Sequence, residues 1–150
     1  RLDRAFASIA GSACYRAGGV VMVPITLLYA GLLGLLAVFL ANLVLYVRLR
    51  GGEQPAWRAD ATLRVQANFV ENVPIGLILL YLLEVAGAAP VVLHVLGARF
   101  VVCRLLHAWG LGRYPGANYP RLIGAQGTFL LLSIMGMGAV YLWLMTPGGS

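Results

Sequence analysis

The stretch from Met22 to Val47 reads MVPITLLYAGLLGLLAVFLANLVLYV and decides the fold. Apart from Pro24, Thr26 and Asn42, it is continuous aliphatic, glycine and aromatic sequence. A helix that crosses a membrane needs about 20 mostly apolar residues. At about 1.5 Å per residue, this stretch is long enough to cross with some tilt. The sequence therefore predicts a transmembrane helix over Met22–Val47.

Three further spans follow this helix. The second joins the polar run Arg64–Asn72 to apolar Val73–Leu83, the third runs from about Val91 to Leu111, and the fourth from about Leu122 to Met145. Four such helices in 150 residues leave only short connections. We therefore expect an all-α, integral membrane four-helix up-down bundle that forms one domain over residues 22–146, with a tail at 147–150.

The composition excludes several classes of protein. Of the residues, 61% are hydrophobic and 11% are charged, whereas a soluble domain usually has about 25% charged residues. So few charges would leave a soluble monomer without a polar surface, and so apolar a chain is not intrinsically disordered. The net charge of +6 comes from arginines that are dispersed without a recognition motif. We attribute it to membrane topology and ligand binding, and we expect no nucleic-acid partner.

Residues 1–21 differ from the rest of the chain. They carry Arg1, Arg4 and Arg16 among small residues, a composition that is typical of a targeting or amphipathic segment. The preferred interpretation is that Met22 is the natural start and that residues 1–21 are upstream or vector-derived sequence. No separate apolar segment with a cleavage site precedes Met22, so a secretory signal is not expected.

The arginines also predict an orientation. The first and third connections are flanked by Arg48, Arg50, Arg58, Arg64, Arg113 and Arg121. The other side of the membrane has only Arg1, Arg4 and Arg16. The positive-inside rule then places the first and third connections in the cytoplasm and both termini outside it. We expect a protein of the bacterial inner membrane.

Ionisable residues inside the predicted spans indicate function, because they are costly in lipid. In the second span, Arg64, Asn68 and Glu71 are spaced i, i+4 and i+7, which places them on one stripe of a helix. The structural alternative is a polar helix end that packs on its neighbours, with Arg64 snorkelling to the interface. Snorkelling does not explain Glu71, which lies two turns deeper and needs a cationic partner.

Polar residues of the other spans lie at the same membrane face. Arg104 and His107 are one turn apart near the cytoplasmic end of the third span. The fourth span begins with Arg121, followed by Gln126 and Thr128. Because the second and fourth spans start, and the third ends, on the cytoplasmic side, the three groups converge at a similar depth. We expect a polar pocket that is open to the cytoplasm.

The charges of this pocket suit a small zwitterionic anion. Arginines bind carboxylates, a carboxylate such as Glu71 binds an ammonium, and Asn68 bonds a donor or an acceptor. Glutathione has two carboxylates, one ammonium and peptide groups, although other small zwitterionic anions fit equally well. An arginine near its sulfur, beside the N-terminus of the fourth helix, would lower the pKa of the thiol.

Other features have ordinary structural interpretations. Glu84 and His94 flank the second turn and are expected to face water or headgroups, and Cys103 is expected to be a small packing residue. Close helix packing is expected at Gly31, Gly34, Gly127, Gly136 and Gly138. The sequence has no metal-ligand spacing, glycine-rich phosphate loop or Ser-His-Asp pattern.

The run RVQANFVENVP at residues 64–74, after one long apolar helix and an arginine-bearing loop, resembles the MAPEG family. These are membrane-associated proteins of eicosanoid and glutathione metabolism. Arg104-Leu-Leu-His107 and Arg121-Leu-Ile-Gly124 are similar to the family's small bacterial branch. The resemblance covers roughly Met22 to Leu144.

The resemblance implies a homotrimer with glutathione as co-substrate, bound between adjacent subunits at the cytoplasmic side. It implies a glutathione S-transferase or peroxidase whose lipophilic substrate enters from the lipid bilayer. By matching position, glutathione would be bound by Arg64, Asn68, Glu71, Arg104 and His107, and Arg121 would be the catalytic arginine that activates the thiol.

The chain departs from the family pattern at two positions. Several relatives have Tyr directly after the Glu, where this chain has Asn72, and some have Tyr one turn beyond the histidine, where it has Leu111. Eicosanoid substrates are therefore not implied, and Tyr114 or Tyr119 would have to supply the aromatic contact.

Two other functions are also open. One is a non-catalytic member that binds a lipid or a glutathione-like ligand. The other is a small multidrug exporter, a mechanism that needs a membrane-embedded carboxylate in the first span. Met22–Val47 contains no acid, which disfavours the exporter.

Overall fold

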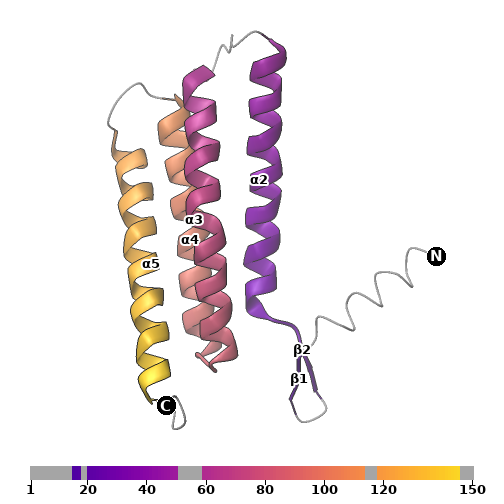
Figure 1. Ribbon diagram of the computed structural model, residues 1–150, viewed down its shortest axis with the longest axis vertical. Coiled ribbons are helices and arrows are strands. Elements are labelled where there is room, and N and C mark those ends of the chain that lie inside the picture. The colour runs from indigo at the N-terminus through magenta and orange to yellow at the C-terminus, as the bar shows by residue number, and fades with distance from the viewer. Residues whose placement is uncertain (1–14, 18–19, 51–58, 114–117, 146–150) are drawn as a thin grey trace, which may run out of the picture.

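The computed structural model describes residues 15–17, 20–50, 59–113 and 118–145. Its four long helices are α2 (Ile25–Leu49), α3 (Ala59–Val85), α4 (Pro90–Arg113) and α5 (Tyr119–Met145). They run alternately up and down in one bundle (Figure 1). Each is long and apolar enough to cross a membrane. The predicted four-helix membrane bundle is confirmed. Of the predicted N-terminal segment 1–21, residues 1–14 and 18–19 lie outside the described residues, as does the predicted tail at 147–150.

A short β-hairpin precedes the bundle and was not predicted. Strand β1 (Tyr15–Ala17) pairs antiparallel with β2 (Val20–Met22), with Tyr15 opposite Met22. The β-branched residues Val20 and Val21 favour extended backbone. The hairpin lies at the end of the bundle where α2 begins and α5 ends (Figure 1).

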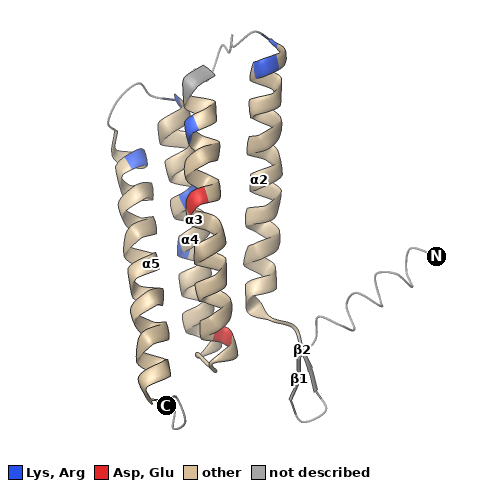
Figure 2. Cartoon of the chain, in the orientation of Figure 1, with Lys and Arg blue, Asp and Glu red and all other residues tan. Residues whose placement is uncertain are grey.

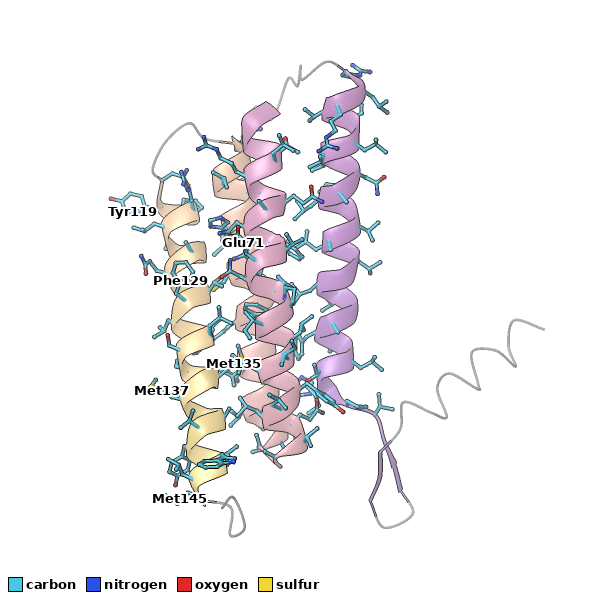
Figure 3. The ribbon with its side chains drawn as sticks, in the orientation of Figure 1. Glu71, Tyr119, Phe129, Met135, Met137 and Met145 are labelled. Carbon is cyan, nitrogen blue, oxygen red and sulfur yellow. The ribbon has the colours of Figure 1, made fainter. Side chains whose placement is uncertain are left out.

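The core is a set of apolar side chains from all four helices. Helices α3 and α4 each contact the three others, whereas α2 and α5 do not contact one another. On α5, Met135 is buried with an exposed fraction of 1%, while Met137 and Met145 are more than 60% exposed on its outer face (Figure 3). The core side chains with the least exposure include Leu33, Leu40, Val65, Leu80, Leu93, Phe100 and Met135.

The outer surface of the bundle is apolar, the reverse of a soluble protein. Large hydrophobic side chains such as Leu35, Val91 and Leu144 are exposed on different helices. An apolar surface of this extent is suited to lipid or to another protein rather than to water. The chain is an integral membrane protein.

Glu84 has a structural role that the sequence interpretation missed. Its Oε1 accepts a hydrogen bond from the backbone N–H of Ile25, and its Oε2 accepts one from Thr26 at 2.8 Å. Because Pro24 precedes α2 and has no side-chain donor or acceptor to cap it, the carboxylate from the end of α3 caps this helix instead. Rather than simply facing water or headgroups, Glu84 joins the C-terminal end of α3 to the N-terminal end of α2.

His94 also takes part in a contact between helices. The Tyr29 hydroxyl on α2 donates to the His94 carbonyl oxygen at 3.0 Å and lies 2.9 Å from His94 Nδ1. The ring of Tyr29 packs where a side chain on Gly97 would clash, with an added Cβ only 2.4 Å from Tyr29 Cδ2. The start of α4 is thereby fixed against α2.

The glycines that permit close packing differ from most of those expected. An added Cβ on Gly31, Gly34 or Gly136 would meet nothing within 4 Å. Of the five expected glycines, Gly127 approaches Cys103 Sγ closely and Gly138 makes an ordinary contact. The glycines whose added Cβ would clash most severely are Gly76, Gly97, Gly110 and Gly124. Hydrophobic pattern does not reveal which side of a helix meets a neighbour's backbone, so these positions were not predicted.

Candidate functional site

Asn118 fixes the start of α5 against the end of α4. Its Oδ1 accepts a hydrogen bond from the backbone N–H of Arg121 at 2.9 Å, three residues into the helix, which is the pattern of an N-cap. Its Nδ2 donates to the carbonyl oxygen of Gly110 at 2.9 Å. Pro120, two residues after Asn118, suits a first helical turn, where backbone N–H groups lack intrahelical partners. The position of Arg121 is therefore set by both helices.

Two glycines let α4 and α5 approach closely at this end. A Cβ on Gly110 would lie 2.4 Å from the backbone nitrogen of Arg121. A Cβ on Gly124 would lie 2.4 Å from the backbone nitrogen of His107 and 2.6 Å from the carbonyl oxygen of Cys103. Since these atoms belong to helix backbone, they cannot move aside as a side chain would. Glycine at both positions brings Arg121 next to the turn that carries Arg104 and His107.

Arg104 lies at the centre of a buried polar cluster. Its side chain is 1% exposed. Nη2 donates to Oδ1 of Asn68 on α3 at 2.6 Å, and Nη1 donates to Oγ1 of Thr128 on α5 at 3.2 Å. The guanidinium also lies over the ring of Phe69, with Cζ 5.8 Å from the ring centroid. One arginine thus joins three helices, α3, α4 and α5.

His107 lies one turn from Arg104 and is 5% exposed. Its Nδ1 is 3.4 Å from the carbonyl oxygen of Arg121. A carbonyl oxygen can only accept, so Nδ1 is the donor in this contact, and in the neutral imidazole Nε2 then carries the lone pair. Among the described residues, His107 Nε2 and Arg104 Nε are buried and have no hydrogen-bond partner. Buried polar atoms without partners mark places where a ligand or a water molecule would supply the missing hydrogen bond.

Arg64 and Glu71 lie on the surface of α3, on either side of Asn68 in sequence. Both side chains are exposed, whereas Asn68 is half-buried against α4. Glu71 forms no hydrogen bond or ion pair with the part of the chain that the structure describes. Figure 3 shows it at mid-height on α3. The charged residues of α3, α4 and α5 lie mainly in the half of the bundle where α3 begins (Figure 2).

The structure therefore brings some predicted site residues together and separates others. Asn68 and Arg104 are bonded, and His107 contacts the backbone of Arg121. Arg64 and Glu71 share their helix with Asn68 but face outward from a single chain. Arg58, one of the arginines of the first connection, lies outside the described residues.

The aromatic replacements suggested by the sequence remain predictions. Tyr119 lies at the start of α5 with its side chain 81% exposed (Figure 3), and Tyr114 lies outside the described residues. Asn72 donates to the backbone carbonyl of Asn68 in its own helix at 2.8 Å. Leu111 is buried in the core. Asn72 is thus bonded within α3 and Leu111 packs inside the bundle.

Sequence reasoning missed Asn118 and the part played by Thr128. The first had a readable signal, because Asn before a Tyr-Pro pair is a typical start of a helix. Thr128 was noted as a polar residue of α5, but its partner depends on how α4 and α5 are rotated about their axes. The spacing of residues along one helix does not specify how that helix is rotated relative to its neighbour.

Comparison with known proteins gives a single result. The MAPEG family model matches residues 26–141, which includes α3, α4 and nearly all of α2 and α5. Searches among curated proteins and among solved structures gave no match. The match covers most of the chain, including Asn68, Arg104 and Arg121. The chain belongs to the MAPEG family.

Proposed function

We propose that the protein is a membrane-bound, glutathione-dependent transferase or peroxidase that acts on lipophilic electrophiles. Family membership supports a role of this general type. The observation that carries the specific proposal is Glu71, an exposed carboxylate in a predicted membrane span with no ion pair among the described residues. An unpaired acid deep in a span costs about 2.5–3.5 kcal/mol or more. The ammonium group of glutathione would satisfy it.

The remaining groups suit the rest of the ligand. Arg64 lies about two turns above Glu71 on α3 and is a suitable partner for a carboxylate. Asn68 lies between them and offers an amide. His107 Nε2 offers a buried acceptor for an N–H or S–H group. Together these groups match a ligand with carboxylates, an ammonium and peptide bonds.

Arg121 is the proposed catalytic residue, because it lies in the first turn of α5, close to His107. A guanidinium and a helix N-terminus both favour a nearby thiolate over a thiol. In conjugation, the thiolate sulfur forms a bond to the electrophilic carbon and the leaving group departs with its electron pair. In peroxide reduction, the thiolate sulfur attacks the terminal oxygen of the hydroperoxide, the O–O bond breaks and the alcohol leaves, which gives the sulfenic acid of glutathione. The thiol of a second glutathione then attacks that sulfur, forms the disulfide and releases water.

The proposal includes a homotrimer, with the ends of the bundle oriented by the positive-inside rule. Arg48, Arg50 and Arg113 lie at the helix ends on one side, so those ends would face the cytoplasm. An alkaline phosphatase fusion after α5 should be active in bacterial cells, whereas one after Arg50 should be inactive. The opposite pair of activities would reverse the orientation.

Conjugation of a chromogenic aryl halide by the purified protein tests the enzyme proposal. Arg121→Ala should lower kcat by about 10²–10³-fold, the effect of removing one preorganised stabilising group. Arg113→Ala is the matched control, because it removes an exposed arginine at the other side of the same connection. Wild-type protein that binds glutathione but turns over no electrophile would instead favour a non-catalytic, lipid- or glutathione-binding role.

A further inference from the structure

The hydrogen bonds around Arg104 have a fixed direction. A guanidinium has only donors, so the Asn68 atom that faces it must be the carbonyl oxygen Oδ1. The two atoms are 2.6 Å apart. The amide nitrogen Nδ2 of Asn68 must therefore point away from Arg104. It has no acceptor among the described residues, and the side chain is only half-buried.

Thr128 fixes Arg104 from the opposite side. Its hydroxyl donates to the carbonyl oxygen of Gly124 in its own helix at 2.7 Å. With its one hydrogen used there, Oγ1 can only accept, and it accepts from Arg104 Nη1 at 3.2 Å. Thr128 is 0% exposed, so water does not compete for this bond. The chain of bonds has a single possible direction, from Arg104 to Thr128 and on to α5 backbone.

We propose that Thr128 and Arg104 are positioning residues that lock the amide of Asn68, so that its Nδ2 donates to a carboxylate or peptide carbonyl of the bound ligand. Arg104 acts through Asn68, because the side chain is buried and its two terminal nitrogens, Nη1 and Nη2, are already bonded to α5 and α3, which leaves only Nε without a partner among the described residues. The inference rests on the proposed function for the identity of the ligand, glutathione. It assigns Thr128 a role in binding although that side chain is behind the site and does not line it.

A merely structural role for Thr128 makes a different prediction. If its hydroxyl served only to stabilise the bundle, its loss would lower the unfolding temperature and leave glutathione affinity unchanged in the folded protein. A positioning role predicts a weaker affinity at temperatures where the protein is fully folded. It also predicts a higher KM for glutathione with kcat at saturation nearly unchanged.

Four variants in detergent-solubilised protein separate these roles, with the dissociation constant for glutathione measured by calorimetry. Thr128→Val removes the hydroxyl at nearly constant volume and should weaken binding about 5- to 10-fold, the effect of about one hydrogen bond. Thr128→Ser keeps the acceptor and should stay within about twofold of wild type. Asn68→Asp keeps an acceptor for Arg104 but has no N–H donor, so it should lose at least about tenfold. Ser133→Ala is the control.

Ser133 suits this control because its hydroxyl bonds the carbonyl of Phe129 in its own helix, as Thr128 bonds Gly124, yet it is exposed and does not touch Arg104. Unchanged affinity in folded Thr128→Val, or full affinity in Asn68→Asp, overturns the inference. A double-mutant cycle in unfolding free energy, between Thr128→Val and Asn68→Ala, tests the lock without glutathione. If the two substitutions have non-additive effects on the unfolding free energy but wild type binds no glutathione, the proposed ligand is rejected and the coupling of Thr128 to Asn68 through Arg104 is retained. Additive effects would reject the lock.

Discussion

Nη2 of Arg104 on α4 lies 2.6 Å from Oδ1 of Asn68 on α3, and the same guanidinium reaches Thr128 on α5. This bond connects α4 to the stripe of α3 that carries Arg64 and Glu71. In the interior of a helical bundle a charged donor strengthens its hydrogen bonds, but leaving it without an acceptor is costly. The relationship therefore affects both the stability of the bundle and the orientation of the candidate site.

Removing Asn68 should destabilise the protein more than removing Arg104. Asn68→Ala leaves a buried charged donor without its partner, and we expect the unfolding free energy to fall by about 1.5–3 kcal/mol. Arg104→Met removes the buried charge itself and leaves only neutral acceptors, on Asn68 and Thr128, without this donor, so we expect a smaller loss than for Asn68→Ala. Unfolding in mixed detergent micelles measures both. A larger loss in Arg104→Met would contradict this description of the cluster.

Glu84 should stabilise the bundle although it lies far from the candidate site. Glu84→Ala leaves the N–H groups of Ile25 and Thr26 without their cap, so stability should fall by about 0.5–2 kcal/mol. Glu71→Ala is the matched control, since that exposed carboxylate has no partner among the described residues. Thermal unfolding of the two variants should show a lower midpoint for Glu84→Ala alone. Equal shifts would argue against the cap.

Gly124 should tolerate no larger residue. In Gly124→Ala the new Cβ would meet helix backbone at Cys103 and His107, so α4 and α5 must separate. We expect a loss of about 1–3 kcal/mol, typical of overpacking, together with weaker glutathione binding. Gly136→Ala, in the same helix with open space around it, should be neutral or stabilising because alanine favours helix. Equal changes in unfolding free energy for the two variants would show that the close approach of α4 and α5 does not require glycine at position 124.

His107 offers a test of which ring nitrogen meets the ligand. An asparagine amide can take the place of Nδ1 and keep a donor toward the Arg121 carbonyl, whereas a glutamine reaches the place of Nε2. If Nε2 accepts from the ligand, His107→Gln should retain more glutathione affinity than His107→Asn. Calorimetry on both folded variants measures this. The reverse order would assign the ligand contact to the other side of the ring.

The sequence predicted the four spans to within a few residues at most ends, because length and apolar content alone identify a membrane helix. The main difference is at α3, which begins at Ala59 rather than near Arg64. Polar sequence at a helix end carries no membrane signal, although it continues the same helix. The hairpin at Tyr15–Met22 is too short for a pattern to predict.

The candidate site was predictable as a set of residues but not as a geometry. Spacing placed Arg104 and His107 one turn apart, and the structure adds that Arg104 is buried and bonded to α3 and α5. The Glu84 cap, the Asn118 bridge and the Thr128 contact each join two helices. Such contacts depend on how helices rotate and approach, which a pattern along one helix does not specify.

The most direct test of the account is calorimetric titration of glutathione into detergent-solubilised wild type, Glu71→Ala and Glu84→Ala. Glu71 is the proposed ammonium partner, and Glu84 is another acid of the same helix, near its C-terminal end and bonded to the start of α2. We predict saturable binding to wild type and to folded Glu84→Ala, and a loss of at least about tenfold in Glu71→Ala. No binding by wild type, or equal affinity in Glu71→Ala, would contradict the central claim that this cluster holds glutathione.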